Sequence, residues 1–236
     1  MDENEIDTAE DVARTAQATL RRSRLEWIAL FLSWTLAKAT WRKKGLRGAE
    51  RTAVIVTLNR WNLGTSVVLT GVVIAWSRND LSAMQWNAQN DDPIFLALTS
   101  VLASYCMSRV IEVLFAFCRD AFAKLADEEP ESDLDGRRRI GLALTSYLEL
   151  ILNFGLLMTL VPYTGWQTGA ASPALVTDVL FYSASTITTS GGGGFVPGGM
   201  MVQGLTLLEI ACGLILLVVC FAVYAGNPRA RPTNVP

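Results

Sequence analysis

The strongest constraint on this chain is a succession of long apolar runs separated by charged connectors. A helix that crosses the hydrocarbon core of a bilayer needs about 20 apolar residues. Four runs come close to or exceed that length, and they lie at 60–77, 94–117, 140–162 and 201–224. We expect each to be helical, because backbone groups exposed to lipid must satisfy their own hydrogen bonds. The sequence therefore predicts an all-α membrane protein with four transmembrane helices.

A shorter apolar run at 25–41 allows two interpretations. Glu26 and Lys38 bracket an uncharged stretch that is too short to span the bilayer. Tryptophans recur along the run and basic groups flank it, as in a helix that lies in the cytoplasmic interface of the membrane. A true span is the alternative.

The basic residues predict the orientation in the membrane. They gather before the first predicted span, in the connector at 118–139 and after the last span, whereas 163–200 contains none. Since cytoplasmic loops of membrane proteins are enriched in Lys and Arg, both termini and the central connector are expected to be cytoplasmic. We therefore expect a multi-pass protein of the cell membrane, with 163–200 on the other side.

The composition argues against catalysis. The chain has no histidine, and its four cysteines lie in or beside apolar runs without metal-ligand spacing. A zinc site and a Ser-His or Cys-His catalytic pair are thereby excluded. We expect no enzymatic activity, no resident cofactor and no nucleic-acid partner.

The segment between the last two apolar runs carries the functional signal. Ser172 and Pro173 are typical of an N-cap and a first helical residue, and 174–187 is an apolar stretch too short to span. Four glycines follow, which cannot continue a helix. We expect the helix to enter the membrane and the glycine stretch to return extended, exposing backbone carbonyls. Irregular backbone at membrane depth is tolerated where it is buried in protein or lines a water-filled path.

Residues 140–224 resemble the two-helix-plus-pore-loop module of bacterial potassium channels, whose signature is T-x-T-T-x-G-Y-G-D-x-x-P. The matching run here is TITTSGGGGFVP at 186–197. Continued without gaps, the register places the family's inner-helix glutamate at Glu209 and its hinge glycine at Gly213. The resemblance implies a re-entrant pore helix and filter loop, assembled as a homotetramer around one axis.

The resemblance also assigns roles to individual residues. The selectivity filter would comprise Thr188, Thr189, Ser190, Gly191, Gly192, Gly193 and Gly194. Thr188 would lie at the base of the pore helix. A permeant monovalent cation, potassium in the family, would be bound at Thr189, Ser190, Gly191, Gly192 and Gly193. Glu209 would support the filter, and Gly213 would be either a hinge or a close-packing position.

Three departures from the family pattern bear on selectivity. Gly192 replaces the filter aromatic, Gly194 replaces the acidic residue of the outer mouth, and Ser190 replaces Val or Ile. A filter without the aromatic should be softer, so two further interpretations stay open: a non-selective cation channel, and a non-conducting accessory subunit. A transporter would show internal repeats, and the two halves of the chain show none.

Four ionisable residues fall inside the predicted spans, where an unpaired charge is costly. Arg109 and Glu112 are three residues apart and are expected to pair on one helix face. Glu149 has no partner that the spacing identifies. For Glu149 and Glu209, structural bracing and a gating or proton-sensing role both remain open.

These observations divide the chain into five regions. They are a cytoplasmic N-terminal region with an amphipathic helix (1–59), a two-span hairpin (60–117), a charged cytoplasmic linker (118–139), the pore module (140–225) and a short cytoplasmic tail (226–236). We expect gating to come from the spans, the N-terminal helix, membrane lipid or an unidentified regulatory partner.

Overall fold

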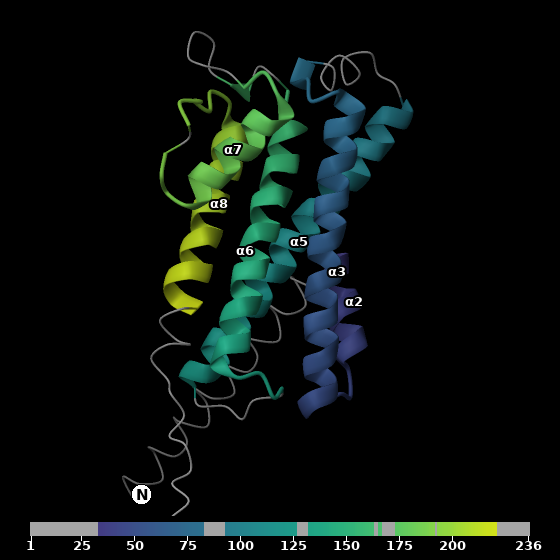
Figure 1. The fold of residues 1–236 in the computed structure, drawn as a ribbon, viewed down its shortest axis with the longest axis vertical. Helices are drawn as coiled ribbons and strands as arrows, with labels where there is room; N and C mark the ends of the chain where they lie inside the picture. The colour runs from purple at the N-terminus through teal and green to yellow at the C-terminus, as the bar shows by residue number, and fades with distance from the viewer. Residues whose placement is uncertain are drawn as a thin grey trace, which may run out of the picture.

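A computed structural model describes residues 33–82, 93–126, 132–162, 165–166, 173–191 and 193–220 (Figure 1). Its elements are α2 (Trp34–Lys43), α3 (Gly48–Ser77), α5 (Pro93–Leu125), α6 (Gly136–Thr159), α7 (Val176–Ile187), α8 (Met200–Leu214) and the π-helix η2 (Ile215–Cys220). Within these ranges the only β-type pairing is at isolated bridges. The predicted all-α class is confirmed.

Three helices are long and apolar enough to cross a membrane, and they are Pro93–Lys124, Gly136–Thr159 and Met200–Leu217. They contain most of the predicted runs at 94–117, 140–162 and 201–224. The predicted span at 60–77 lies within α3. This helix has 30 residues, but its most apolar stretch is less apolar than those of the three helices that could cross a membrane. Three spans are thus compatible with a membrane, and the fourth stays a prediction.

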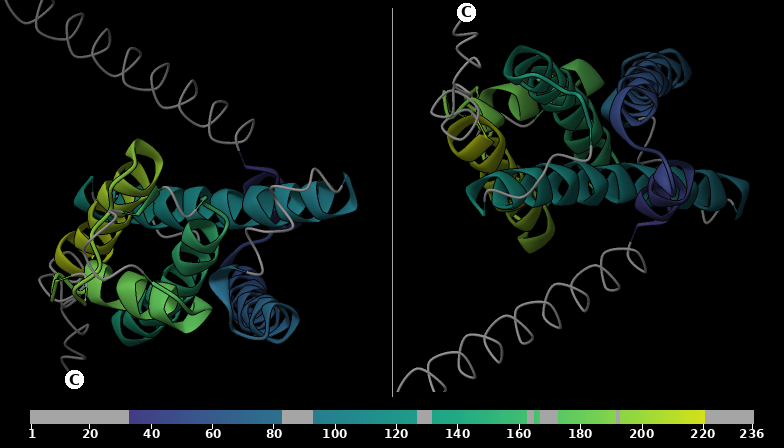
Figure 2. Two further views of the ribbon diagram at one scale, coloured as in Figure 1. Left: turned by 90° about the horizontal axis from the view of Figure 1, so that it is seen from above. Right: turned by 90° about the horizontal axis from the view of Figure 1, so that it is seen from below.

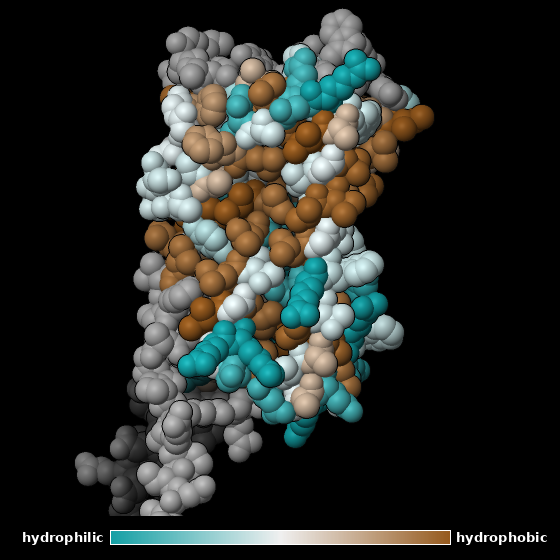
Figure 3. All heavy atoms as spheres, in the orientation of Figure 1, coloured by the Kyte–Doolittle hydropathy of each residue, from teal (hydrophilic) through white to brown (hydrophobic). Residues whose placement is uncertain are grey.

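One face of the molecule has the apolar surface expected of a membrane protein. Figure 3 shows a broad apolar band over α3 and α6, with hydrophilic side chains gathered toward the two ends. Exposed side chains in this part of the fold include Val67, Val68, Leu144 and Leu148. Because apolar surface on this scale is unfavourable in water, the band is suited to contact with lipid or with another apolar surface.

Helix α6 lies at the centre of the fold. Of its apolar stretch, 56% is buried, against 28% for α5 and 33% for the last span. Helices α3, α5, α7 and α8 all pack against it, and α5 also contacts η2. Seen end-on, α5 is inclined to α6 and reaches from the α2 side to the α8 side (Figure 2). Helix α6 is therefore the most buried of the three candidate spans.

Helix α2 runs beside α5 rather than across it (Figure 1). Ser33 caps its first turn, and the Ser33 hydroxyl lies 2.8 Å from the carbonyl oxygen of Ser108, in the middle of α5. The Thr35 backbone N–H donates to the Ser108 hydroxyl at 3.1 Å. The expected interfacial helix at 25–41 overlaps α2 only from Trp34 to Trp41, and this part packs along α5. Residues 25–32 lie outside the described residues.

An ion-pair cluster joins α5 to α6. Arg109 donates from Nε to Glu149 Oε1 at 2.7 Å and from Nη2 to Glu149 Oε2 at 3.0 Å. Arg109 also pairs with Glu112, as the three-residue spacing predicts. Glu149, for which the sequence identifies no partner, is thus held by two hydrogen bonds to a buried guanidinium.

Candidate functional site

The short helix α7 begins later than the sequence predicts. It starts at Val176, so Pro173 precedes the helix, and Ser172 lies outside the described residues. The Asp178 carboxylate accepts the backbone N–H groups of Ala174 and Leu175, both at 3.0 Å. The predicted N-cap was wrong because the chain before α7 is extended and Asp178, in the first turn, satisfies these donors instead.

This extended segment is paired with the end of α3. Leu81 donates its backbone N–H to the Ala174 carbonyl at 3.0 Å, and Val176 donates to the Asn79 carbonyl at 3.1 Å. An isolated antiparallel bridge between Asp80 and Leu175 lies between these two bonds. The start of α7 is therefore fixed at the same end of the molecule as the C-terminus of α3.

The other end of α7 lies against the middle of α6 and the C-terminal end of α8. Tyr147, halfway along α6, donates its hydroxyl to the Ile187 carbonyl at 2.9 Å. A Cβ placed on Gly213 of α8 would lie 2.8 Å from Ile187 Cγ1 and 2.9 Å from the Ile187 carbonyl oxygen. Figure 1 shows α7 inclined between these two helices. Gly213 is therefore a close-packing position; a hinge at Gly213 stays a prediction.

After α7 the chain returns to the level at which α6 ends. Gly198 and Gly199 donate their backbone N–H groups to the Gly165 carbonyl at 2.9 and 2.8 Å. Trp166 and Pro197 form an isolated antiparallel bridge beside these bonds. The segment thus runs through α7 toward the middle of α6 and comes back to the end of α6 before α8 begins.

A strained turn ends α7. Thr189 donates its backbone N–H to the Thr186 carbonyl and Ser190 donates to the Ser185 carbonyl, both at 2.9 Å. This pair of bonds is a Schellman motif, whose left-handed position is usually occupied by glycine. Here that position is Thr189, with φ of 57°. A β-branched residue in this conformation is uncommon, and such strain tends to occur at functional positions.

The six filter candidates that the structure describes are exposed in the single chain, and Gly192 lies outside the described residues. The Thr188 and Ser190 hydroxyls lie 2.8 Å apart, and Ser190 Oγ also donates to the Ser185 carbonyl at 3.1 Å. Gly193 donates its backbone N–H to the Gly191 carbonyl at 2.8 Å. The prediction of an extended stretch was wrong here, because this bond closes a tight turn.

An aromatic ring that the sequence did not single out packs on this turn. A Cβ placed on Gly193 would lie 2.5 Å from Cε1 of Phe181, on α7. Gly193 also has φ of 60°, so the position requires glycine on two grounds. Phe181 therefore places a ring beside a loop that lacks the family's own filter aromatic at Gly192.

Glu209 is completely buried, and it contacts α7 rather than the loop. Its Oε1 accepts the hydroxyl of Ser183, which also lies 2.8 Å from the Ile151 carbonyl of α6. Its Oε2 has no hydrogen-bond partner in the described part of the chain. Hydrogen bonding to the filter loop was expected, and the contact is instead with the helix behind the loop. Glu209 thus links α6, α7 and α8 through one hydroxyl.

The oxygen atoms at this site are hydroxyl and carbonyl oxygens. Among the residues that the structure describes, no three His, Cys, Asp or Glu side chains gather as metal ligands. No family model, no curated protein and no solved structure matches this chain, so the resemblance to potassium channels is carried by residues 186–213 themselves.

Proposed function

We propose that this chain is one subunit of a homotetrameric channel that conducts monovalent cations, potassium foremost, across the cell membrane. The observation that carries the proposal is the position of Ile187, the last residue of α7, against Tyr147 in the middle of α6 and against Gly213 near the end of α8. A helix C-terminus carries a partial negative charge. Placed halfway across a bilayer, it stabilises a cation that has left bulk water.

The exposed loop supports assembly around an axis. Thr188, Thr189, Ser190 and Gly191 follow directly on α7 and are exposed in the single chain. Irregular backbone at membrane depth must be covered by protein or line an aqueous path. Since one such loop cannot enclose an axis, copies of the chain would have to supply the remaining walls, and a closed ring of identical subunits does so.

One observation favours a second candidate, a non-conducting accessory subunit. The Gly191 carbonyl, which would face the ion, accepts the backbone N–H of Gly193 instead. In this conformation one of the expected ligand oxygens is already occupied. Conduction therefore requires the Gly191–Gly193 turn to open in the assembled ring, and an accessory subunit would keep it closed.

The test is a reversal potential across a planar bilayer, with the purified protein between equal concentrations of potassium and sodium chloride. A potassium-selective pore gives a potential near the potassium limit. A potential near zero with cation-over-anion preference indicates a non-selective cation pore. Well-formed tetramers that carry no current under any applied voltage or lipid composition support the accessory subunit.

The chain offers a matched pair of glycine variants for this test. Gly191→Ala and Gly45→Ala both place a side chain at positive φ, 92° and 80°, and neither new Cβ has an atom within 4 Å. The two changes should therefore strain the backbone alike. A channel predicts that Gly191→Ala abolishes or alters the current while Gly45→Ala leaves it intact. Equal effects would contradict a filter at Gly191.

A further inference from the structure

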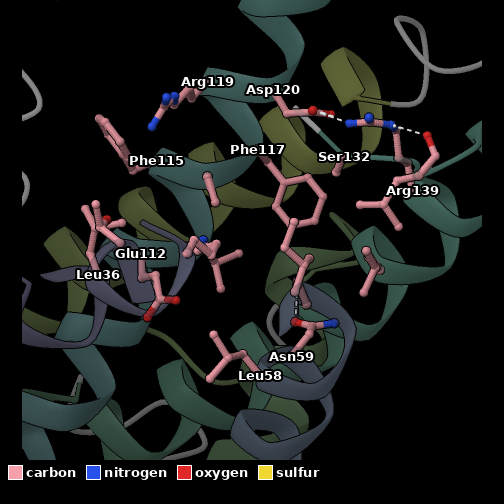
Figure 4. A pocket seen from close by; sticks show the side chains of 18 of the residues that line it. Leu36, Leu58, Asn59, Glu112, Phe115, Phe117, Arg119, Asp120, Ser132 and Arg139 are labelled. Carbon is pink, nitrogen blue, oxygen red and sulfur yellow. Dashed lines mark hydrogen bonds and ion pairs between the residues drawn. The ribbon is translucent and has the colours of Figure 1, made fainter. Parts of the chain in front are cut away.

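A cavity of about 310 Å³ lies away from the pore loop, between α2, α3, α5 and the start of α6. Figure 4 shows side chains of Arg119, Asp120 and Arg139 at one end of it and those of Leu58 and Asn59 at the other. Ser132 and Leu134, just before α6, complete the wall. None of these side chains belongs to the pore-loop site.

The cavity wall is strongly basic. Six basic and two acidic side chains line it, and the basic ones are Lys43, Arg51, Arg109, Arg119, Lys124 and Arg139. The acidic ones, Glu112 and Asp120, pair with Arg109 and Arg139. Basic side chains thus outnumber acidic ones on the cavity wall, which suits the cavity to an anion.

The surroundings of Lys43 support this inference. Burial is the main cause that lowers the pKa of the Lys43 ammonium, and Arg51, Arg119 and Arg109 lower it further, while Glu112 acts in the opposite direction. Lys43 is therefore a half-buried cation among other cations. An anion bound beside it would relieve both the lost hydration and the repulsion.

The cavity also has apolar walls and an unused donor. Leu36, Ile55, Leu58 and Phe117 contribute apolar surface. Asn59 accepts the Ser146 hydroxyl through Oδ1 at 3.0 Å, but its buried Nδ2 has no hydrogen-bond partner in the described chain. A ligand that offers both acceptor oxygens and apolar surface would match this combination.

We propose that this cavity binds an anionic phospholipid, with the phosphate headgroup among the basic side chains and an acyl chain along the apolar wall. A phospholipid fits better than free phosphate, because much of the wall is apolar and the cavity lies at the charged ends of apolar helices. Basic pockets between helices at a membrane surface are suited to anionic headgroups. This binding does not depend on conduction.

The test measures the thermal unfolding midpoint of the full-length protein in detergent micelles, during titration with phosphatidylglycerol, phosphatidylcholine or inorganic phosphate. Phosphatidylglycerol should raise the midpoint in a saturable way, and native mass spectrometry should show it retained. Phosphatidylcholine and inorganic phosphate should have little effect. An equal rise with inorganic phosphate would overturn the lipid assignment, and an equal rise with phosphatidylcholine would overturn the requirement for an anion.

Two double variants test whether the phospholipid binds in this cavity. Each cation removed should weaken binding about fivefold, so Lys43→Gln with Arg51→Gln should weaken it roughly 25-fold. Lys38→Gln with Lys44→Gln removes two exposed charges that do not line the cavity and should leave binding unchanged. Lys43→Arg should retain it. Equal weakening by the two double variants would show that only general surface charge is involved.

Discussion

Helix α6 is joined to α5 and to α7 by contacts of different kinds. On the α5 side, Glu149 forms two hydrogen bonds to the Arg109 guanidinium. On the α7 side, the contacts are neutral. Tyr147 donates to the Ile187 carbonyl, and a Cβ placed on Gly155 would lie 2.6 Å from Leu180 Cδ2, which marks a close helix crossing.

The two contacts differ in how much free energy their rearrangement costs. Separating a buried ion pair leaves charges without compensation and costs several kcal/mol, whereas a neutral hydrogen bond contributes about 1 kcal/mol net. The α5–α6 contact should therefore behave as a fixed clamp. The α7 side can shift at lower cost, which is what the proposed opening between Gly191 and Gly193 would require.

The largest effect is expected from Arg109→Met, which removes the cation from between Glu112 and Glu149. The free energy of unfolding should fall by about 3–5 kcal/mol, because Glu149 is left buried without a counter-charge. Denaturant titration in detergent, followed by circular dichroism, measures the loss. The double change Arg109→Met with Glu149→Leu should recover most of it. A double variant as unstable as the single one would contradict the clamp.

On the other side of α6, Gly213→Ala should weaken the contact of α8 with α7. The new Cβ would lie within 3 Å of two Ile187 atoms, and overpacking of this kind costs about 1–3 kcal/mol. Gly204→Ala in the same helix is the control, since no atom lies within 4 Å of its Cβ. If both variants unfold at the same denaturant concentration, the Gly213 contact does not exist in the protein.

Thr189→Gly should stabilise the protein, in contrast to the two destabilising changes above. Removing a β-branched residue from φ of 57° relieves about 1 kcal/mol of strain, so the protein should become more stable. The side chain of a predicted cation-binding residue is lost as well, so a channel should become more stable and less selective at once. Thr188→Gly, at φ of −81°, relieves no such strain and should bring no gain in the same unfolding assay.

The smallest effect is expected from Glu209→Gln. In the described chain the Glu209 carboxylate meets only the Ser183 hydroxyl, and an amide oxygen can accept the same hydrogen bond. The loss should be about 0.5 kcal/mol. Glu149→Gln removes the negative charge that pairs with Arg109, so it should lower the free energy of unfolding several times more in the same denaturant titration. Equal losses would mean that Glu209 has a charged partner and that the two sides of α6 are held alike.

The sequence predicted which segments are helical better than it predicted where each helix begins and ends. The run at 94–117 marks the apolar part of α5, but the helix continues to Leu125 because Arg119, Ala121 and Lys124 are good helix formers. Apolarity reports the part that suits a membrane, whereas helicity continues wherever the backbone can hydrogen-bond. For the same reason α3 begins at Gly48, well before the run at 60–77.

Long-range contacts were harder to predict. Arg109 and Glu149 are on different helices, and no local spacing relates them. The sequence signal for this pair was that the two residues carry opposite charges and that each lies inside an apolar run. The pairing of Ala174 with Leu81 and the packing of Phe181 on Gly193 had no comparable signal, because both depend on how separate segments meet.

The two backbone bonds to the Gly165 carbonyl have a consequence for how the chain between α6 and α8 can vary in length. They close a loop whose ends are held by the backbone, while α7 is anchored separately to α3 and to Tyr147. The entropy of closing a flexible loop grows only logarithmically, by about 0.6 kcal/mol for each doubling of its length. The chain between Ile187 and Gly198 is held at one end by the hydrogen bond from Tyr147 and at the other by the bond to Gly165, so an insertion there should break one of these contacts.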